Sequence, residues 1–446
     1  MNQRPVHVIG GGLAGAECAF QLARRRVPVV LHEMRPASMT AAHRTGGLAE
    51  LVCSNSFRSD DPLHAAGLLK REMEFFDSVI LSAARQSAVP AGSALAVDRH
   101  CFAHLVTSTI EAHPLIHIHR QEVKVLPEGD VVLATGPLTS PSLSDALTDL
   151  LGVDHLYFYD SIAPIVDADS LDRAKLFWGS RYGKGGGEDY LNAAMTRAEY
   201  HAFHQALLEA EVVPLHEFEK TLFFEGCLPV EELARRGIDT LRFGPMKPVG
   251  LTAPDGGRPY AVVQLRQENL TRSHFNLVGF QSRLKWGEQK RVFSMIPGLE
   301  RAEFVRLGQV HRNTFINAPA HLNRFYRLRK RPRIRLAGQI TGVEGYLESA
   351  ATGLAVGLYI AFERCGQPAD PLPTTTAFGA LARHLVESRP DHFQPANINY
   401  GLFPELDTPL PKTQRRAALA ARARSALNEW ARRHDSGLQE VMVASA

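Results

Sequence analysis

The stretch from Val6 to Glu33 constrains the fold of this chain more than any other. It begins with an apolar run, Val6 to Ile9, continues with small and apolar residues at helical spacing, and closes with a second apolar run, Val27 to Leu31. The turn after the first run carries glycines in G-x-G-x-x-G spacing, namely Gly10, Gly12 and Gly15. This order predicts a strand, a tight turn, a helix and a second strand with an acidic residue at its end, which is typical of a dinucleotide site.

Each part of this stretch has a physical role in such a site. Gly10 allows the tight turn, Gly12 lets the backbone approach a pyrophosphate, and Gly15 lets the helix pack closely on the sheet. The first N–H groups of the helix can hold phosphates, and Glu33 can accept hydrogen bonds from ribose hydroxyls. The stretch alone does not separate FAD from NAD. The expected cofactor contacts are Gly10, Gly11, Gly12, Leu13, Ala14, Gly15 and Glu33.

Composition limits the class of protein. The chain has 446 residues, of which 45% are hydrophobic and 22% charged, as in soluble globular proteins. Its five cysteines form no C-x-x-C pair, which argues against a disulfide framework or a zinc site and favours a reducing compartment. The first apolar run is too short for a signal peptide, and the longest, Ala350 to Phe362, is too short to span a bilayer. We therefore expect a cytoplasmic protein of two or three domains, without a metal site or a membrane segment.

A strand–turn–helix pattern recurs far downstream. Ile334 to Ile340 predicts a strand, Thr341 to Gly345 a glycine-rich turn, and Tyr346 begins a helix that runs to about Phe362. A discontinuous FAD domain needs this second unit, because it brings further backbone donors to the flavin, whereas an NAD-only domain does not. Val131 to Gly136 resembles the strand that returns beside the pyrophosphate in flavoproteins with two dinucleotide-binding domains. The further cofactor contacts expected from these segments are Gly136, Gly338, Gln339, Gly342 and Tyr346.

Residues from about 160 to 305 differ from the rest in their local sequence pattern. They contain many residues that favour turns, and their strand-like runs are short, such as Tyr260 to Leu265 and Phe275 to Phe280. We therefore predict an α/β protein with a Rossmann-like FAD-binding domain, discontinuous in sequence, and an inserted α+β domain. The expected limits are 1–180 and 306–446 for the FAD-binding domain and 181–305 for the inserted, substrate-facing domain. Helices are expected at Leu63–Ala84, Asp98–Ala112, Thr376–Ser388 and Lys412–Arg433.

Two cysteines stand out by their surroundings. Cys53 lies where an apolar run gives way to Ser-Asn-Ser, and Cys227 lies between a glycine and Leu-Pro. Either can be a buried structural thiol, which is the usual fate of a cysteine without a disulfide. An open polar setting can instead lower a thiol pKa and make the side chain reactive.

Positive charge is concentrated between Arg266 and Arg335, where 16 Lys and Arg stand against four Glu. Such an excess is typical of a protein that binds a polyanion such as nucleic acid. The alternatives are a solvated face and arginines that pair with flavin phosphates.

The chain resembles the folate- and flavin-dependent tRNA (uracil-5-)-methyltransferases in motifs spread over nearly its whole length. One position departs from the family pattern, because Phe57 stands where leucine is expected. The matching motifs are GGGLAGAE at 10–17, HEMRP at 32–36, AELVCSNSFRSD at 49–60, FEGCLPVEE around Cys227, RFGPMKPVGL at 242–251, VGFQSRLKWGEQKRVF at 278–293, HRNTFINAP at 311–319, GQITGVEGYLESAATG at 338–353 and INYGLFP at 398–404.

This resemblance implies methylation of C5 of uridine 54 in the tRNA T-loop, with methylenetetrahydrofolate as carbon donor and FAD reduced by NAD(P)H as reductant. Uracil C5 is a poor nucleophile, and a thiolate that adds to C6 activates it. By resemblance, Cys227 attacks C6, while Cys53 lies near the flavin and assists carbon transfer. Tyr346 is the expected aromatic group beside the flavin, although it can also be a core residue.

Three alternatives stay open at this point. The first is the larger wobble-uridine-modifying tRNA flavoprotein, which shares the fold but has an added helical C-terminal region. The second is a small-molecule flavin oxidoreductase whose basic stretch is incidental. The third is an RNA-binding protein with a purely structural flavin.

Overall fold

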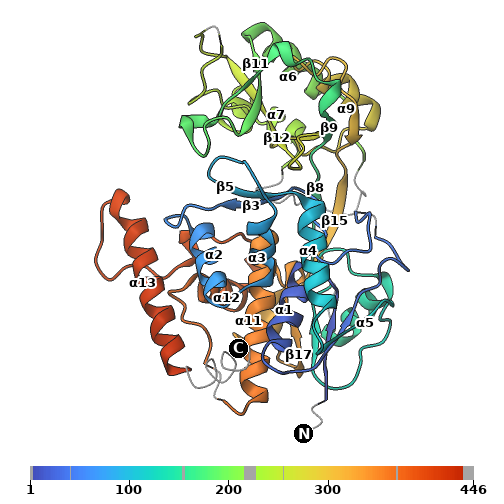
Figure 1. Cartoon of the computed structure of the whole chain (residues 1–446), viewed down its shortest axis with the longest axis vertical. Coiled ribbons are helices and arrows are strands. Elements are labelled where there is room, and N and C mark those ends of the chain that lie inside the picture. Colours follow the sequence, from blue (N-terminus) through green and yellow to red (C-terminus); the bar gives the residue numbers. More distant parts are fainter. Residues whose placement is uncertain are drawn as a thin grey trace.

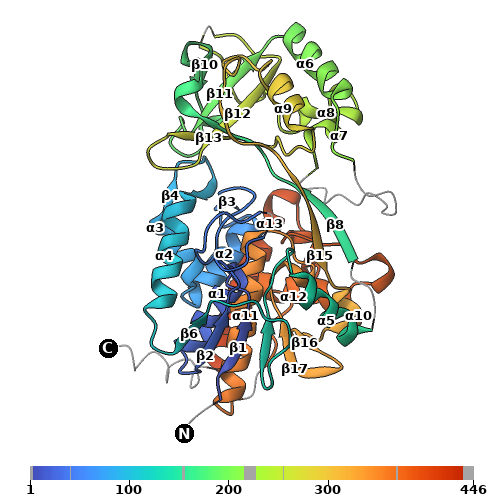
Figure 2. The same cartoon turned by 90° about the vertical axis from the view of Figure 1, so that its right-hand side faces the viewer.

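The computed structural model describes residues 4–40, 42–152, 156–214, 228–254, 256–367 and 370–434. The chain forms a parallel-sheet domain, lower in Figure 1, and an inserted domain above it. Each has its own hydrophobic core. The two crossings between the domains are β8 (Leu156–Ser161) and β15 (Val310–Phe315), which pair antiparallel and run side by side in Figure 2. The predicted fold class is therefore confirmed, since an antiparallel sheet interrupts the sequence of a Rossmann-like parallel sheet.

The parallel sheet has the strand order β16-β17-β7-β1-β2-β6. Neighbours run parallel except β16 and β17, which form an antiparallel edge. The pairing of β17 with β7 returns the distant segment to the first βαβ unit, as predicted. The strands are β1 (Val6–Ile9), β2 (Val29–His32), β6 (Ile116–His119), β7 (Val131–Leu133), β16 (Arg327–Leu328) and β17 (Arg331–Leu336).

Helices α1 (Leu13–Ala23) and α11 (Tyr346–Arg364) pack against each other at backbone distance. A Cβ atom on Gly353 would collide with the carbonyl oxygen of Ala14, and one on Gly357 would lie 2.8 Å from the Cβ of Gln21. This close approach brings the first turn of α11 beside the glycine turn that precedes α1. Almost all of α11 is buried, so its apolar sequence forms a core helix, as predicted.

The single helix expected at 63–84 is wrong, because the structure has two, α2 (Ala65–Phe75) and α3 (Val79–Gln86). Asp77 adopts φ +51°, and the Ser78 hydroxyl caps α3 by accepting from the N–H of Leu81. The carbonyl oxygen of Phe76, at the break, accepts hydrogen bonds from Gln21 of α1 and from Arg24, the residue that caps the end of α1. The other α-helices of this domain are α4 (Arg99–Glu111), α5 (Pro141–Leu151), α10 (Ala318–His321), α12 (Ala377–Glu387) and α13 (Lys412–Arg433). A small antiparallel sheet in the order β3-β5-β4 consists of β3 (Ser56–Ser59), β5 (Ala94–Val97) and β4 (Ala88–Val89).

The inserted domain is an antiparallel sheet in the order β10-β11-β12-β13-β9-β14, covered by helices. The first strand of this sheet begins at Ile165, and both β9 and β10, which lie before residue 181, pair with strands of the inserted sheet. The domain limits 1–180, 181–305 and 306–446 stay a prediction. The elements are β9 (Ile165–Asp167), β10 (Leu176–Trp178), β11 (Tyr190–Met195), α6 (Arg197–Glu209), α7 (Val230–Arg235), α8 (Thr240–Phe243), β12 (Ala261–Gln267), β13 (His274–Leu277), α9 (Trp286–Phe293) and β14 (Phe304–Arg306).

Histidines from β1, β2 and β6 gather on one face of the parallel sheet. His7 Nδ1 lies 3.1 Å from His32 Nε2, and the ring centroids of His32 and His119 are 5.4 Å apart. Burial, followed by repulsion from the other histidines, lowers the pKa of His7 and brings that of His32 to about 4. The hydrogen bond between His7 and His32 requires one of these two rings to be a neutral acceptor, so it opposes protonation of both at once.

We expect the free energy of unfolding to fall on acidification from about pH 6.5 to about pH 4. In this range the unfolded chain binds a proton at His32 that the folded chain resists, so the unfolded state gains relative stability. Urea denaturation of His32→Asn at several pH values should give a flatter acid limb than the parent. His392, on an exposed turn, supplies the control His392→Asn, which should keep the parent slope. An unchanged slope in His32→Asn would contradict this assignment.

Candidate active site

A pocket of about 1030 Å³ lies at the carboxyl ends of the parallel strands, where open α/β sheets bind their ligands. Gly15 and Gly342 lie outside its lining. A Cβ on Gly15 would collide with the carbonyl oxygen of Gly10, and one on Gly342 would lie 2.5 Å from the ring of Phe393, so these two glycines serve close packing. The predicted cofactor residues that do line the pocket are Gly10, Gly11, Gly12, Leu13, Ala14, Glu33, Gly136, Gly338, Gln339 and Tyr346.

The glycine turn leaves room for a ligand against its backbone. Gly10 has φ +102°, and a Cβ there would collide with the carbonyl oxygen of Ala134 on the neighbouring strand. A Cβ on Gly12 would meet no atom within 4 Å, because this position faces the pocket. Gly12 is also the N-cap of α1 and supplies no side-chain cap, so the first N–H groups of the helix are available to an anion. The residues present therefore fit the pyrophosphate of a dinucleotide.

Glu33 is already engaged within the protein. Its Oε2 accepts from the N–H of Gly11 at 3.0 Å and from Arg35 Nη2 at 3.0 Å, and its Oε1 accepts from the backbone N–H and the Nε of Arg35, both at 2.9 Å. Burial opposes ionisation, but the hydrogen bonds and charge of Arg35 outweigh it and lower the pKa of Glu33. Each oxygen thus accepts two hydrogen bonds, and a ribose hydroxyl would have to share or replace one. Ribose binding by Glu33 stays a prediction.

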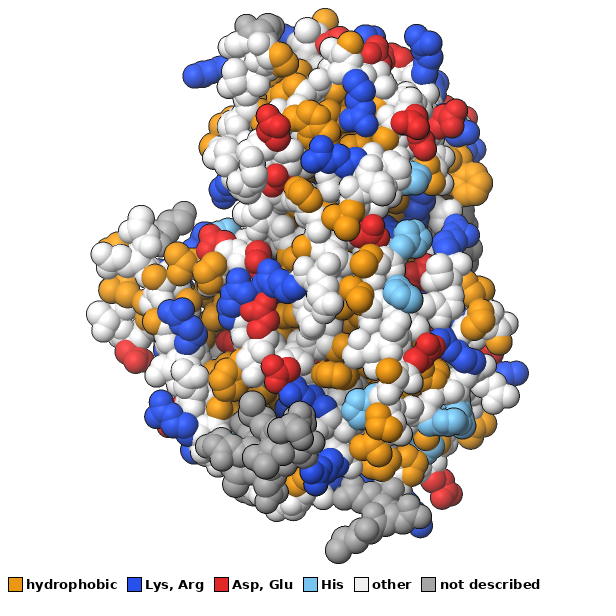
Figure 3. All heavy atoms as spheres, viewed as in Figure 1, with side chains coloured by type: hydrophobic (Ala, Val, Ile, Leu, Met, Phe, Trp, Pro, Cys, Tyr) orange, Lys and Arg blue, Asp and Glu red, His pale blue; other side chains and the backbone are white. Residues whose placement is uncertain are grey.

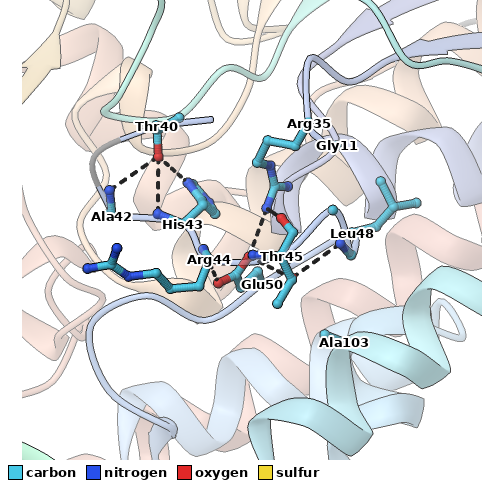
Figure 4. Close-up of polar contacts among 12 residues, drawn as sticks. Gly11, Arg35, Thr40, Ala42, His43, Arg44, Thr45, Leu48, Glu50 and Ala103 are labelled. Carbon is cyan, nitrogen blue, oxygen red and sulfur yellow. Dashed lines mark hydrogen bonds and ion pairs between the residues drawn. The ribbon is translucent and has the colours of Figure 1, made fainter. Parts of the chain in front are cut away.

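Arg35 also ties the segment from Thr40 to Glu50 to the sheet (Figure 4). Its Nη1 donates to Glu50 Oε2 at 3.1 Å, and the Glu50 carboxylate accepts from the backbone N–H of Arg44 at 2.8 Å and of Thr45 at 3.0 Å. No role for this segment was predicted from the sequence. The available signal in the sequence was the pair Arg35 and Glu50, which flank the loop between them, since opposite charges at the two ends of a loop frequently pair.

His43 lies in the same segment and lines the pocket. Its ring Nδ1 lies 2.6 Å from the hydroxyl of Thr40, which also accepts from the backbone N–H of His43 at 3.2 Å. Burial, followed by the charge of Arg35, lowers the pKa of His43 to about 4. This imidazole is therefore neutral at physiological pH and was missed by the sequence analysis.

Cys53 and Tyr346 meet although 293 positions separate them in the sequence. The phenolic oxygen of Tyr346 accepts from the backbone N–H of Cys53 at 2.6 Å and from that of Ser54 at 3.1 Å. Burial, followed by the electrostatic interaction with Cys53, raises the pKa of Tyr346, so the phenol stays protonated. Cys227 lies outside the described residues, and the structure therefore gives no position for the second predicted thiol.

The surroundings of Cys53 are cationic. The guanidinium groups of Arg99, Arg266 and Arg306 all interact electrostatically with Cys53. The buried side chain of Asn55 joins this turn to the inserted domain, because it donates to the carbonyl oxygen of Gln267 at 3.1 Å and accepts from Arg266 Nε at 2.8 Å. Both domains thus hold the segment that carries Cys53.

The basic stretch from Arg266 to Arg335 does not form one surface. Arg266 and Arg335 are buried, and within the described residues five of the other cations of the stretch form ion pairs with acidic side chains. On the face drawn in Figure 3, cationic and acidic side chains are interspersed. The charge count along the sequence therefore overstated the positive surface. The ion pairs are Arg283–Glu232, Lys285–Glu211, Arg291–Glu288, Arg324–Glu387, Arg327–Glu363 and Arg335–Glu363.

Within the described ranges, the structure adds neither a membrane-spanning helix nor a metal-binding cluster to this site. Every helix of the described ranges is too short or too polar to cross a bilayer. Within the same ranges, no three His, Cys, Asp or Glu side chains are grouped so that they could hold a metal ion.

The fold and the pocket define an α/β protein whose parallel sheet carries the glycine turn typical of dinucleotide-binding domains and whose inserted domain is antiparallel. The family model described as "Glucose inhibited division protein A" matches residues 5–368. The chain is 57% identical to the methylenetetrahydrofolate–tRNA-(uracil-5-)-methyltransferase TrmFO of Pelobacter propionicus over 96% of this chain and 94% of the relative. It is 54% identical to that of Zymomonas mobilis over 96% and 97%. The chain belongs to this methyltransferase family, as its motifs indicated.

Among solved structures, GidA of Aquifex aeolicus has the same fold. The TM-score is 0.66 at 16% identity, and the alignment covers 95% of this chain and 73% of that one. This likeness supports the arrangement of a parallel-sheet domain with an insertion.

Proposed function

We propose that this protein methylates C5 of uridine 54 in the T-loop of tRNA, in the cytoplasm, with methylenetetrahydrofolate as carbon donor and FAD reduced by NAD(P)H as reductant. The names of relatives more than half identical over nearly the whole chain support this activity. The structural observation that carries it is the hydrogen bond from the backbone of Cys53 to Tyr346. Through it, a candidate thiol segment is held at the rim of the dinucleotide pocket.

Different residues of the chain have different roles in this reaction. The glycine turn and the start of α1 hold the pyrophosphate, and Tyr346 places a flat ring and the Cys53 turn beside the flavin site. Cys227 adds to uracil C6, which makes C5 nucleophilic towards the folate methylene. Cys53 assists transfer of that carbon. FAD, when bound and reduced by NAD(P)H, would supply the hydride that converts the methylene level to methyl, and would be reoxidised in doing so.

The purified, FAD-loaded protein is expected to form 5-methyluridine in unmodified tRNA when methylenetetrahydrofolate and NADH or NADPH are present. Nucleoside mass analysis with site mapping measures the product and its position, and tRNA with cytidine at position 54 is the matched control. Absence of 5-methyluridine, with bound FAD verified, would contradict the proposal. A product at the wobble uridine would favour the larger tRNA flavoprotein as the functional relative.

A further inference from the structure

A second cleft, of about 1690 Å³, lies where the inserted domain meets the parallel-sheet domain. One wall is the N-terminal half of α4 with the segment before Leu51, and the other is formed by β14 and the start of α9. Figure 1 shows α4 rising to meet the inserted domain there. We call it the α4 cleft, and its cationic and aromatic lining groups are Arg44, Arg99, His100, His104, Trp286 and Arg306.

Trp286 presents its indole to this cleft. It is the first residue of α9, and 59% of it is exposed. In the part of the chain that the structure describes, no aromatic ring packs on it and no cation sits over it. An exposed indole of this kind is a platform on which a flat ligand can stack.

Arg306 faces the cleft from β14 with donors that lack a partner. Its Nε and Nη2 are buried and make no hydrogen bond with the described residues. Buried donors in proteins are nearly always paired, so a group from outside the chain is the natural acceptor. A guanidinium fork of this kind matches the oxygens of a phosphate.

The remaining charges of the cleft leave it positive. Arg99 is paired with Glu268, and Glu50 is paired with Arg35. Arg44 uses only its backbone N–H in the contacts around Glu50, and its side chain points away from them in Figure 4. Two guanidinium groups, those of Arg44 and Arg306, are therefore available to an anion.

The α4 cleft adjoins the candidate active site. Glu50 lines both the cleft and the dinucleotide pocket, and Arg99 Nη1 donates to the carbonyl oxygen of Leu51, two residues before Cys53, at 3.0 Å. Arg306 interacts electrostatically with both Cys53 and Tyr346. A substrate whose reacting base lies at Cys53 can therefore extend into the cleft.

We propose that the α4 cleft binds an unpaired nucleotide of the RNA substrate that neighbours the target uridine. Its base stacks on Trp286, and its phosphate is held by Arg306 and Arg44. A flat exposed ring beside unpaired cations is how proteins hold splayed-out, single-stranded nucleotides. This inference rests on the proposed tRNA substrate and identifies where the loop beside the reacting base is held.

Steady-state kinetics of Trp286→Ala test the stacking. The KM for tRNA is expected to rise about tenfold, whereas the KM for methylenetetrahydrofolate and the rate of flavin reduction by NADH stay at parent values. Trp286→Phe should restore most of the tRNA affinity, because a phenyl ring still stacks. Phe243→Ala, which removes an aromatic side chain 83% exposed in the same domain, is the matched control and should leave the KM for tRNA unchanged.

Binding of a T-arm stem–loop RNA at several salt concentrations tests the phosphate contact. Arg306→Gln should weaken binding and lower the slope of log Kd against log salt by about 0.7, the value for one phosphate of a single strand. The inference would be overturned if Trp286→Ala raised the KM for methylenetetrahydrofolate and left the KM for tRNA unchanged, or if it changed neither KM. If the parent protein makes no 5-methyluridine, the proposed function fails. The stem–loop binding measurements do not depend on methylation, so they still show whether the α4 cleft binds RNA.

Discussion

Replacing Gly12 by valine is expected to give a folded protein that retains no FAD. The position has extended backbone angles that valine adopts readily, and the space beside its Cα is empty of protein atoms. That space is the part of the pocket where the pyrophosphate would approach the turn. Loss of a single charge-assisted hydrogen bond of about 1.5 kcal/mol already weakens binding more than tenfold, and a branched side chain there would displace several.

The measurement is the flavin absorbance of the purified protein, together with far-UV circular dichroism and the melting temperature without added FAD. Gly287→Val is the matched control, because Gly287 is another glycine with no atom near its missing Cβ and it lies on α9, away from the pocket. The control should keep its FAD. A Gly12→Val protein with normal FAD content would show that the dinucleotide is held elsewhere, and an unfolded one would contradict the reading of the empty space.

Replacing either Cys53 or Cys227 by alanine is expected to lower tRNA methylation about a thousandfold or more, as removal of a nucleophile or its partner does in other enzymes. FAD content should stay at the parent level in both variants. Tyr346 hydrogen-bonds the backbone of Cys53 rather than its side chain, so Cys53→Ala leaves that contact intact. Cys101→Ser, at the start of α4, is the matched control and should methylate normally.

A covalent trap separates the roles of the two thiols. RNA with 5-fluorouridine at position 54 should form a stable adduct with the thiol that adds to C6, because C5 then carries fluorine in place of a removable proton. We expect the adduct to form in Cys53→Ala and to be absent in Cys227→Ala. The reverse result would exchange the two roles. Adducts in both variants would remove both thiols from the C6 attack.

Local patterns in the sequence predicted local structure well. The strand, glycine turn and helix from Val6 onward and the helix at 412–433 formed as expected, because hydrophobic periodicity and glycine spacing act over a few residues. The expected helix at 63–84 failed at a point that periodicity does not reveal. The break at Asp77 and Ser78 is stabilised by the side chains of Gln21 and Arg24, which lie more than 50 positions away.

Contacts between distant segments were the part of the site that the sequence could not supply. The basic stretch was counted without its partners, yet Glu211, Glu232 and Glu363 come from outside it and offset part of its charge. The pairing of Glu33 with Arg35 could have been guessed from their spacing, whereas the contact between Tyr346 and Cys53 depends on how α11 packs against α1. The motif resemblance identified those two residues without that geometry.

The paired strands β8 and β15 make the inserted domain a separable module. At their upper end the N–H of Ile162 donates to the carbonyl oxygen of Gln309 at 2.8 Å, so the chain leaves and re-enters the parallel-sheet domain at neighbouring points. Because the ends of the insertion are one hydrogen bond apart and its core is its own, a tight hairpin turn has the right span to replace it. The whole insertion can therefore be gained, lost or exchanged at a single site in the gene without a change in the strand order of the parallel sheet.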